Sequence, residues 1–484
     1  MRYVFKKAVI SVVLVLIMLI TTSNSIALNQ NPNFPLPYDD VDPLVDVEVT
    51  VDILKIRSLE RFEYVRPTIE KIDLSSDPDF FVKVFINDEE FVSDTWEDTK
   101  YVYEPDFSAT LNVPDEENLV NIRIELWDWN QDKDKLCDIG PDDGIDGVDI
   151  VYDLTTGHWS GDDQIGDPSG YGRLCGCDDG STYKYSRDCE LWFDITYNDY
   201  DGDNIPYWTE VNVYGTDPEI NDTGRDDDGD NVPIEWEWKW EYDPFVWDNH
   251  ESLDPDVDGV ENYEEFLVSG FDSDPFRDDL YIELDQMEES PDGVQSILPD
   301  GAKELLTTAY NSHNVVYHID DGCMGGGEMI PFDELTPRDD LEIIYMNYFL
   351  HGDENNWRRG VFRYGVVVYD GTYAGFNFER GSFQISSSRV NKKAVPRTQK
   401  MLDIAYASVY MHETGHTLDL RYEGVDNQGT YYPWQLPYWI YGPYRSTMNY
   451  RYTYRIVDYS DGSHGPRDYD DWSNIDLTGF QHHW

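Results

Sequence analysis

Basic residues are scarce in this chain, which has 35 Lys and Arg against 98 Asp and Glu, for a formal net charge of −63. A surface of this charge repels nucleic acid and bare anionic membranes, so neither is expected as a partner. Aromatic residues make up 15% of the chain, too many for a disordered acidic polymer, and they indicate packed cores. The acids gather in patterned loops, which favours divalent-cation binding, although a high-salt habitat would favour them too.

Long apolar runs are also few. The only one spans Ala8 to Ile20, after Arg2, Lys6 and Lys7, and a small and polar stretch follows it. It is short for a spanning helix, which needs about 20 residues. We expect residues 1–27 to be a signal peptide, cleaved near Ala27, with retention as a membrane anchor as the alternative. The mature protein is then secreted, extracellular or at the cell surface, with no integral membrane domain.

Cysteine is limited to five residues. Cys137, Cys175, Cys177 and Cys189 fall in the N-terminal half, and in an exported protein they predict two disulfides of undetermined connectivity. Zinc binding by these four is the alternative. Cys323 is left over and is expected to be buried.

Histidine is scarce as well, with ten residues, yet two of them flank a glutamate in His412-Glu413-Thr414-Gly415-His416. Residues 398–418 contain no proline and no glycine before Gly415, and their apolar residues recur near helical spacing. Residues four apart share one helix face, so His412 and His416 can bind one zinc ion together. Glu413 is the predicted general base and proton donor of a zinc hydrolase.

A second motif follows at Ser446-Thr447-Met448-Asn449-Tyr450. It resembles the methionine turn that metzincin-type zinc proteases place beneath the metal, which gives Met448 a structural role. This chain differs from metzincins at the third zinc ligand. The metzincin motif continues with a Gly and a third His, and the corresponding residues here are Asp419 and Tyr422.

The third zinc ligand must therefore come from elsewhere. Asp419 lies one turn too far along the helix, so Asp426, which follows the flexible Gly424, is the favoured candidate. Glu423 and His464 are the alternatives, and each of these acids could equally be a solvated loop carboxylate. Tyr422, Tyr450 or a nearby His is expected to stabilise the oxyanion.

Residues 199–274 carry three imperfect acidic repeats. Asp residues around a turn, followed by a helical Glu, supply the oxygen ligands that calcium prefers. The predicted calcium ligands are Asp199, Asp201, Asp203, Glu210, Asp226, Asp228, Asp230 and Glu237, and a third copy runs from Asp254 through Asp256 and Asp258 to Glu264-Glu265. With the linking phrases Tyr-Gly-Thr-Asp-Pro (214–218) and Asp-Ser-Asp-Pro (272–275), these repeats resemble calcium repeats akin to thrombospondin type 3. The alternative is a solvated acidic linker.

The N-terminal part alternates like an all-β unit, most clearly at 47–54 and 121–128. Segments 76–84 and 127–132 together resemble the synaptotagmin-type calcium-binding β-sandwich. That resemblance implies calcium ligands at Asp73, Asp79, Asp128, Asn130 and Asp134. An acid-tipped sandwich without an ion is the alternative.

The C-terminal part reads as mixed α and β, with strands at 280–285, 315–320 and 365–369 and a helix at 301–312. From Asp278 to Trp484 it resembles secreted archaeal and bacterial zincin-like proteins, which are putative proteases as a group. The predicted fold class is multidomain: an N-terminal all-β sandwich (43–197), acidic calcium-binding repeats (198–275) and a C-terminal α+β zincin-like catalytic domain (276–484).

The predicted function is a secreted, calcium-stabilised zinc endopeptidase acting on a protein or peptide substrate. The rival is a non-enzymatic, calcium-dependent surface or adhesion protein with a degenerate catalytic domain.

Overall fold

The computed structural model describes residues 47–59, 77–114, 118–142, 144, 146–166, 170–180, 187–379, 381–422, 425 and 430–480. The predicted signal peptide (1–27), Asp73, Glu423 and the predicted zinc ligand Asp426 lie outside them. No helix among the described residues is both long enough and apolar enough to span a membrane.

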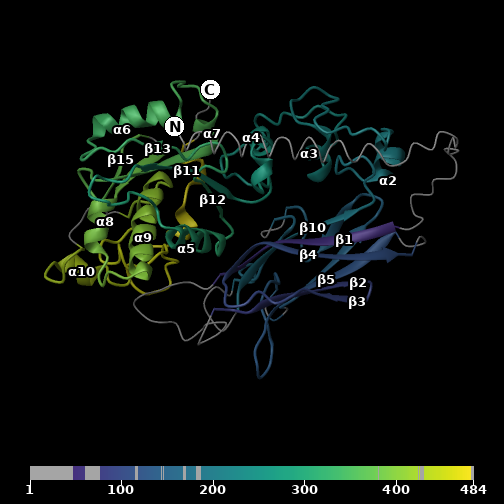
Figure 1. Ribbon diagram of the computed structural model, residues 1–484, viewed down its shortest axis with the longest axis horizontal. Coiled ribbons are helices and arrows are strands. Elements are labelled where there is room, and N and C mark those ends of the chain that lie inside the picture. Colours follow the sequence, from purple (N-terminus) through teal and green to yellow (C-terminus); the bar gives the residue numbers. More distant parts are fainter. Residues whose placement is uncertain are drawn as a thin grey trace, which may run out of the picture. The chain divides into compact units, whose positions relative to one another are not determined.

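Two antiparallel sheets form the N-terminal part (Figure 1). The first has the order β4 (Tyr101–Val113), β1 (Val47–Ser58), β10 (Cys189–Tyr197) and β9 (Arg173–Cys175). The second has the order β3 (Glu89–Val92), β2 (Phe80–Ile86), β5 (Leu119–Asp128), β7 (Val148–Asp153) and β8 (His158–Gly161), with β6 (Lys135–Leu136) paired to β5. The strands predicted at 47–54 and 121–128 lie within β1 and β5. In β1, Val47, Val49 and Val51 are fully buried, because alternate side chains of a strand share one face.

A buried ion pair ties neighbouring strands of the first sheet together. Glu190 on β10 contacts the guanidinium of Arg173 on β9 at 2.9 Å and that of Arg57 on β1 at 3.0 Å. Burial alone would raise the pKa of Glu190, but the two guanidinium charges outweigh it and lower that pKa. The carboxylate is therefore ionised where a lone buried acid would be protonated.

The cysteines do not follow the prediction. None of the five forms a disulfide bond with another described cysteine, so the two expected disulfides are absent among the described residues. Cys137, Cys175, Cys177 and Cys189 are buried, whereas Cys323, expected to be buried, is exposed.

Three acidic loops follow the sheets, and each leads into a short helix. These helices are α2 (Tyr207–Thr209), which continues as the π-helical turn η1 (Glu210–Tyr214), α3 (Ile234–Lys239) and α4 (Asn262–Leu267), with the 3-10 turn η2 (Ser269–Phe271) after the last. Pro206 and Pro233 precede the first two helices. Proline suits this place because a helix start lacks partners for its first amides anyway.

The C-terminal part is built on a sheet whose main strands are parallel. The order is β12 (Val316–Asp320), β11 (Asp279–Met287), β14 (Phe362–Val368), β16 (Ser382–Ser386) and β15 (Gly375–Asn377), with β13 (Met329–Ile330) against β11. Only β15, at the edge, runs antiparallel to its neighbour. The remaining elements are α5 (Asp300–Asn311), α6 (Arg338–Ile344), η3 (Tyr345–Phe349), α7 (Arg358–Val361), α8 (Ser387–Lys393), α9 (Gln399–Thr417), α10 (Leu436–Ile440), η4 (Trp472–Asn474) and η5 (Leu477–Phe480).

Both faces of this sheet are covered. On β11, Leu280, Ile282 and Leu284 join one core with residues of α5 and α9, whereas Tyr281 joins a second core with residues of α6 and η3. All seven residues of β14 are buried, as expected for a parallel strand between two layers of helices. The arrangement is therefore α/β, with helices between parallel strands, and the predicted α+β class is wrong for this part.

Candidate functional site

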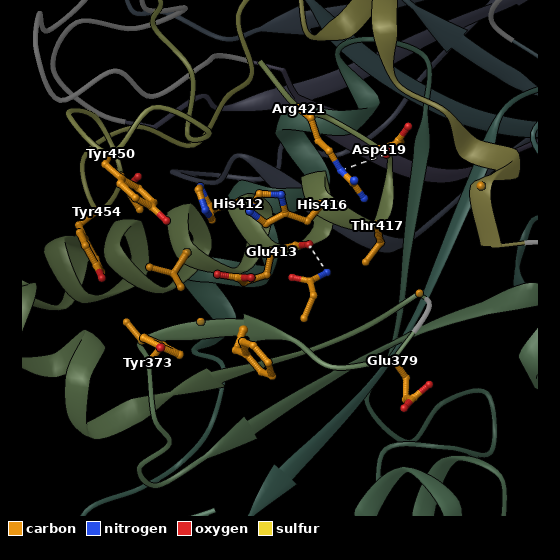
Figure 2. A pocket seen from close by; sticks show the side chains of 18 of the residues that line it. Tyr373, Glu379, His412, Glu413, His416, Thr417, Asp419, Arg421, Tyr450 and Tyr454 are labelled. Atoms are coloured by element: carbon orange, nitrogen blue, oxygen red, sulfur yellow. Dashed lines mark hydrogen bonds and ion pairs between the residues drawn. The ribbon is translucent and has the colours of Figure 1, made fainter. Parts of the chain in front are cut away.

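Helix α9 carries the paired histidines. Thr398 caps its start, with its hydroxyl accepting a hydrogen bond from the Met401 amide at 3.3 Å. The helix is buried along most of its length between α5 and the sheet, which explains its apolar residues. The ring centroids of His412 and His416 are 4.8 Å apart and the rings are nearly perpendicular, at 86°. Figure 2 shows the two imidazoles side by side with Glu413 next to them.

The downstream methionine turn orients His412. The Nδ1 atom of His412 lies 2.8 Å from the carbonyl oxygen of Thr447, to which it donates a hydrogen bond. A proton fixed on Nδ1 leaves the Nε2 lone pair for a metal ion, an arrangement common for metal-binding histidines. Met448 is only 5% exposed and lies against α9 at Gly415, where an added Cβ would be 2.6 Å from the methionine sulfur. Gly415 thus lets the turn approach the helix.

Glu413 faces the edge strand β15. A Cβ added at Gly375 would lie 2.0 Å from the Glu413 carboxylate oxygen Oε1, so the carboxylate occupies the space above a bare glycine. The Asn377 side chain also donates a hydrogen bond to the Glu413 carbonyl oxygen at 3.3 Å. Strand and helix together border a cavity of about 1050 Å³ that His412, Glu413 and His416 line.

The environment of His416 favours its neutral form. Burial, together with the nearby charge of Arg421, lowers the pKa of His416 to about 4. A neutral imidazole has a lone pair to offer, and two such groups beside a carboxylate are a donor set that suits zinc. The residues present therefore fit a zinc ion.

The alternatives for the third ligand separate in the structure. Asp419 borders the cavity, and its side chain is 66% exposed and pairs with Arg421 at 3.2 Å, so its exclusion as a ligand stays a prediction. His464 is not among the cavity-lining residues, and its Nδ1 atom is 3.0 Å from Asp468. Asp426 stays a prediction.

Of the tyrosines expected to stabilise an oxyanion, only one is in place. Tyr450 lines the cavity with its ring centroid 5.5 Å from that of His412. Tyr422 instead stacks on Tyr469, with centroids 5.0 Å apart. Sequence reasoning missed Tyr454 and Tyr373, which also line the cavity (Figure 2). No local pattern in the sequence marked either residue, because residues 450–454 form turns and not a helix.

The three acidic loops share one hydrogen-bonding pattern. In each, the first Asp accepts a hydrogen bond from the amide three residues on, at 2.7 to 2.8 Å, and the third Asp accepts one from the amide two residues on, at 2.7 to 3.1 Å. The first Asp residues are Asp199, Asp226 and Asp254, and the third are Asp203, Asp230 and Asp258. The same local geometry occurs three times, as the sequence repeats predicted.

Acidic clusters result that could hold a metal ion. Asp199, Asp201 and Asp203 place carboxylate oxygens within 4.8 Å of one another, as do Asp226, Asp228 and Asp230. Asp203 also groups in this way with Glu210 and with Asp222, which the sequence prediction missed. Burial, with the neighbouring charge of Asp203, raises the pKa of Glu210 to about 8.

In the third repeat, Glu264 and Glu265 differ in whether the carboxylate is available to bind a cation. Glu265 is 1% exposed, and neither of its carboxylate oxygens has a hydrogen-bond partner among the described residues. Glu264 instead closes the start of α4 in a capping box with Glu261. Buried carboxylate oxygens without hydrogen bonds are costly unless a cation is bound, so Glu265 fits a cation ligand.

The loops at one end of the N-terminal sheets also bring predicted ligands together. The amide of Asp79 donates to Asp128 at 3.1 Å, and the side chain of Asn130 donates to Asp128 at 3.0 Å. The Asn130 amide donates to Asp134 at 3.1 Å. The ammonium group of Lys135 lies 3.6 Å from Asp128, so this cluster already contains a positive charge.

No family model matches the sequence, and no curated protein matches it. Among solved structures, human GIVD cytosolic phospholipase A2 in complex with methyl gamma-linolenyl fluorophosphonate is 15% identical over 31% of this chain and 17% of its own, with a TM-score of 0.18. A structure of a C2 domain is 13% identical over 31% and 98%, also with a TM-score of 0.18. The two tandem C2 domains of extended-synaptotagmin 2 are 12% identical over 34% and 43%, with a TM-score of 0.20.

The chain thus covers less than a fifth of the phospholipase, and TM-scores this low carry no inference about activity or ligand. The correction of the predicted fold class rests on the largely parallel sheet described above.

Proposed function

We propose that this chain is an exported zinc-dependent endopeptidase that cleaves peptide bonds in protein substrates. The observation that supports this proposal best is the hydrogen bond from His412 Nδ1 to the Thr447 carbonyl oxygen. That bond occupies Nδ1 of His412, so the Nε2 lone pair is available beside His416.

His412 and His416 would hold the zinc ion, with Asp426 as the predicted third ligand. Zinc, when bound, acidifies water and polarises a carbonyl group. The Glu413 carboxylate accepts the proton of the attacking water and then delivers it to the leaving amine. Tyr450, beside His412, is placed to donate a hydrogen bond to the developing oxyanion.

The edge strand supports a peptide as the substrate. Among the described strands, β15 pairs only with β16, so its other edge has backbone groups available for pairing. An extended peptide can add to such an edge through main-chain hydrogen bonds, whatever its side chains. Residues 373–377 of this strand and its approach line the cavity, next to Glu413.

Calcium is the proposed stabilising ion of the first and third acidic repeats. Their clusters offer carboxylate oxygens, which are the ligands calcium prefers. The buried and unpartnered Glu265 supports this assignment for the third repeat, and the grouping of Glu210 with Asp203 and Asp222 supports it for the first.

The test is cleavage of casein by the purified, zinc-loaded protein. Glu413→Gln should reduce the rate by about 10²- to 10⁴-fold, because a general base is lost, while zinc stays bound. Glu379→Gln removes another carboxylate that lines the same cavity and should leave the rate nearly unchanged. A Glu413→Gln variant as active as the wild type would contradict the mechanism. A zinc-loaded wild type that cleaves neither casein nor a peptide library would favour the non-enzymatic, calcium-dependent alternative.

A further inference from the structure

The second acidic repeat differs from the first in the residue that joins its third Asp and its helical Glu. After the first loop, Asp222 brings a carboxylate to the group formed by Asp203 and Glu210. In the second repeat, the group formed by Asp230 and Glu237 is completed by His250. An imidazole thus stands in the second repeat where the first has an oxygen ligand. The sequence repeats gave no sign of His250, which lies outside the repeated positions.

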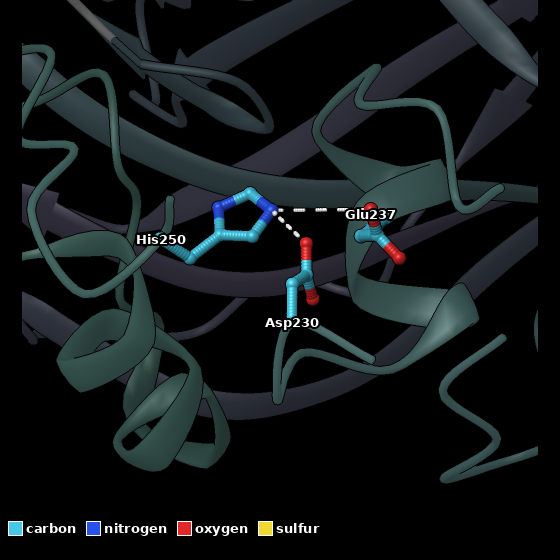
Figure 3. A group of neighbouring side chains, drawn as sticks. All are labelled: Asp230, Glu237 and His250. Atoms are coloured by element: carbon cyan, nitrogen blue, oxygen red, sulfur yellow. Dashed lines mark ion pairs between the residues drawn. The ribbon is translucent and has the colours of Figure 1, made fainter. Parts of the chain in front are cut away.

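The geometry of this group is compact and closed to solvent. The side chains of Asp230, Glu237 and His250 are all 0% exposed. The Nε2 atom of His250 lies 3.3 Å from Asp230 Oδ2 and 3.8 Å from Glu237 Oε1. Figure 3 shows Nε2 directed between the two carboxylates, which come from the loop and from α3. Two ligands of one tetrahedral zinc ion are about 3.3–3.6 Å apart, close to both distances.

Three buried polar atoms of the group, on Glu237 and His250, lack hydrogen bonds among the described residues. Neither oxygen of Glu237, nor Nε2 of His250, has a hydrogen-bond partner among the described residues. A buried carboxylate and a buried imidazole nitrogen without hydrogen bonds are costly, and one cation shared with Asp230 would satisfy both of them.

We propose that Asp230, Glu237 and His250 bind a transition-metal dication of the zinc class, whereas the first and third repeats bind calcium. Calcium is a hard ion that selects oxygen ligands. Replacing one oxygen ligand by an imidazole nitrogen therefore weakens calcium binding. Zinc and similar ions accept imidazole together with carboxylate. This site is separate from His412 and His416 and does not rest on the proposed peptidase activity.

The opposite side of the His250 ring supports a ligand role. The side-chain nitrogen Nδ2 of Asn262 lies 3.1 Å from Nδ1 of His250 and 2.9 Å from the Tyr242 hydroxyl, whereas the side-chain oxygen of Asn262 is buried without a hydrogen-bond partner among the described residues. An amide can present either its oxygen or its nitrogen at one position. Exchanging these two atoms would let the Asn262 oxygen accept hydrogen bonds from the Nδ1–H group of His250 and from the Tyr242 hydroxyl. The Nε2 lone pair of His250 would then be left for a cation, as in other metal-binding histidines.

The experiment uses the full chain with His412→Ala and His416→Ala, so that zinc at the proposed catalytic site is removed. This double variant is equilibrated with zinc in a large excess of calcium, and bound zinc is counted by atomic emission. One zinc ion per chain is expected to remain. Adding His250→Gln should weaken zinc binding about 10-fold or more, without changing the number of calcium ions bound. His351→Gln is the matched control, since His351 is half-exposed and pairs with Glu328.

X-ray absorption of zinc bound to the double variant gives a measurement that needs no change at His250. One imidazole nitrogen among oxygen ligands is the expected shell, and it holds even if His250→Gln destabilises the fold. The proposal is overturned if the double variant retains no zinc in excess calcium, or if the shell contains oxygen alone. It is also overturned if a folded His250→Gln variant binds zinc as tightly as its parent, which would make the His250 contact a structural hydrogen bond.

Discussion

Gly375 on the edge strand is the sharpest place to test how the proposed active site is positioned. A Cβ added there would be 2.0 Å from Glu413 Oε1, whereas ordinary contacts begin at 3.4 Å, so the carboxylate must retreat by about 1.4 Å (3.4 − 2.0). A misplacement of about 1 Å can reduce a rate by about 10²-fold, which corresponds to about 2.7 kcal/mol of barrier. Gly375→Ala should therefore lower kcat/KM for casein by about 10²-fold.

Zinc content and Tm of this variant should stay close to the wild type, because the clash involves the end of one flexible side chain and neither histidine. Gly270→Ala is the matched control, since no atom lies within 4 Å of a Cβ added at Gly270. Full activity in Gly375→Ala would refute the placement of Glu413 against the strand. Loss of zinc in that variant would mean that Gly375 supports the metal ligands instead.

The calcium, ion-pair and helix-packing predictions are each checked by stability. A calcium-selective chelator should lower Tm and open residues 199–265 to a foreign protease, because a ligand at 100-fold excess over its Kd adds about 2.7 kcal/mol; unchanged melting and digestion would contradict the calcium sites. Glu190→Gln should cost about 3–5 kcal/mol, because it leaves the buried Arg173 uncompensated. Folding lowers the pKa of Glu190 from its unfolded value of 4.5. The stability that the ionised Glu190 carboxylate contributes is therefore present above pH 4.5 and is lost as the pH falls through the folded pKa. Denaturant unfolding at a series of pH values should show this loss in the wild type and not in the variant. Gly415→Ala should lower the free energy of unfolding by about 1–3 kcal/mol, because the added methyl group overpacks against Met448. Denaturant unfolding measures this change, and an unchanged midpoint would contradict the packing of the methionine turn against Gly415.

Local patterns predicted local structure well. The helix around His412 and the strands at 47–54 and 121–128 follow from hydrophobic periodicity, which depends only on neighbours in the sequence. The acidic loops were also readable, because each loop makes its hydrogen bonds within a few residues. Predictions that needed distant partners did less well. The two disulfides, the burial of Cys323 and the α+β class were wrong.

The sequence by itself determined the local motifs on which the proposed chemistry rests: two histidines one helical turn apart, a glutamate between them and three copies of an acidic loop. The tertiary structure alone decided what each of them faces. The Thr447 carbonyl that orients His412 is 35 residues away in sequence, and Gly375, which faces Glu413, lies on another element. His250 joins Asp230 across a shorter gap, but again from outside the repeated positions. The physical reason is that such contacts depend on how strands and helices pack, and packing leaves no periodic trace in the segments it brings together.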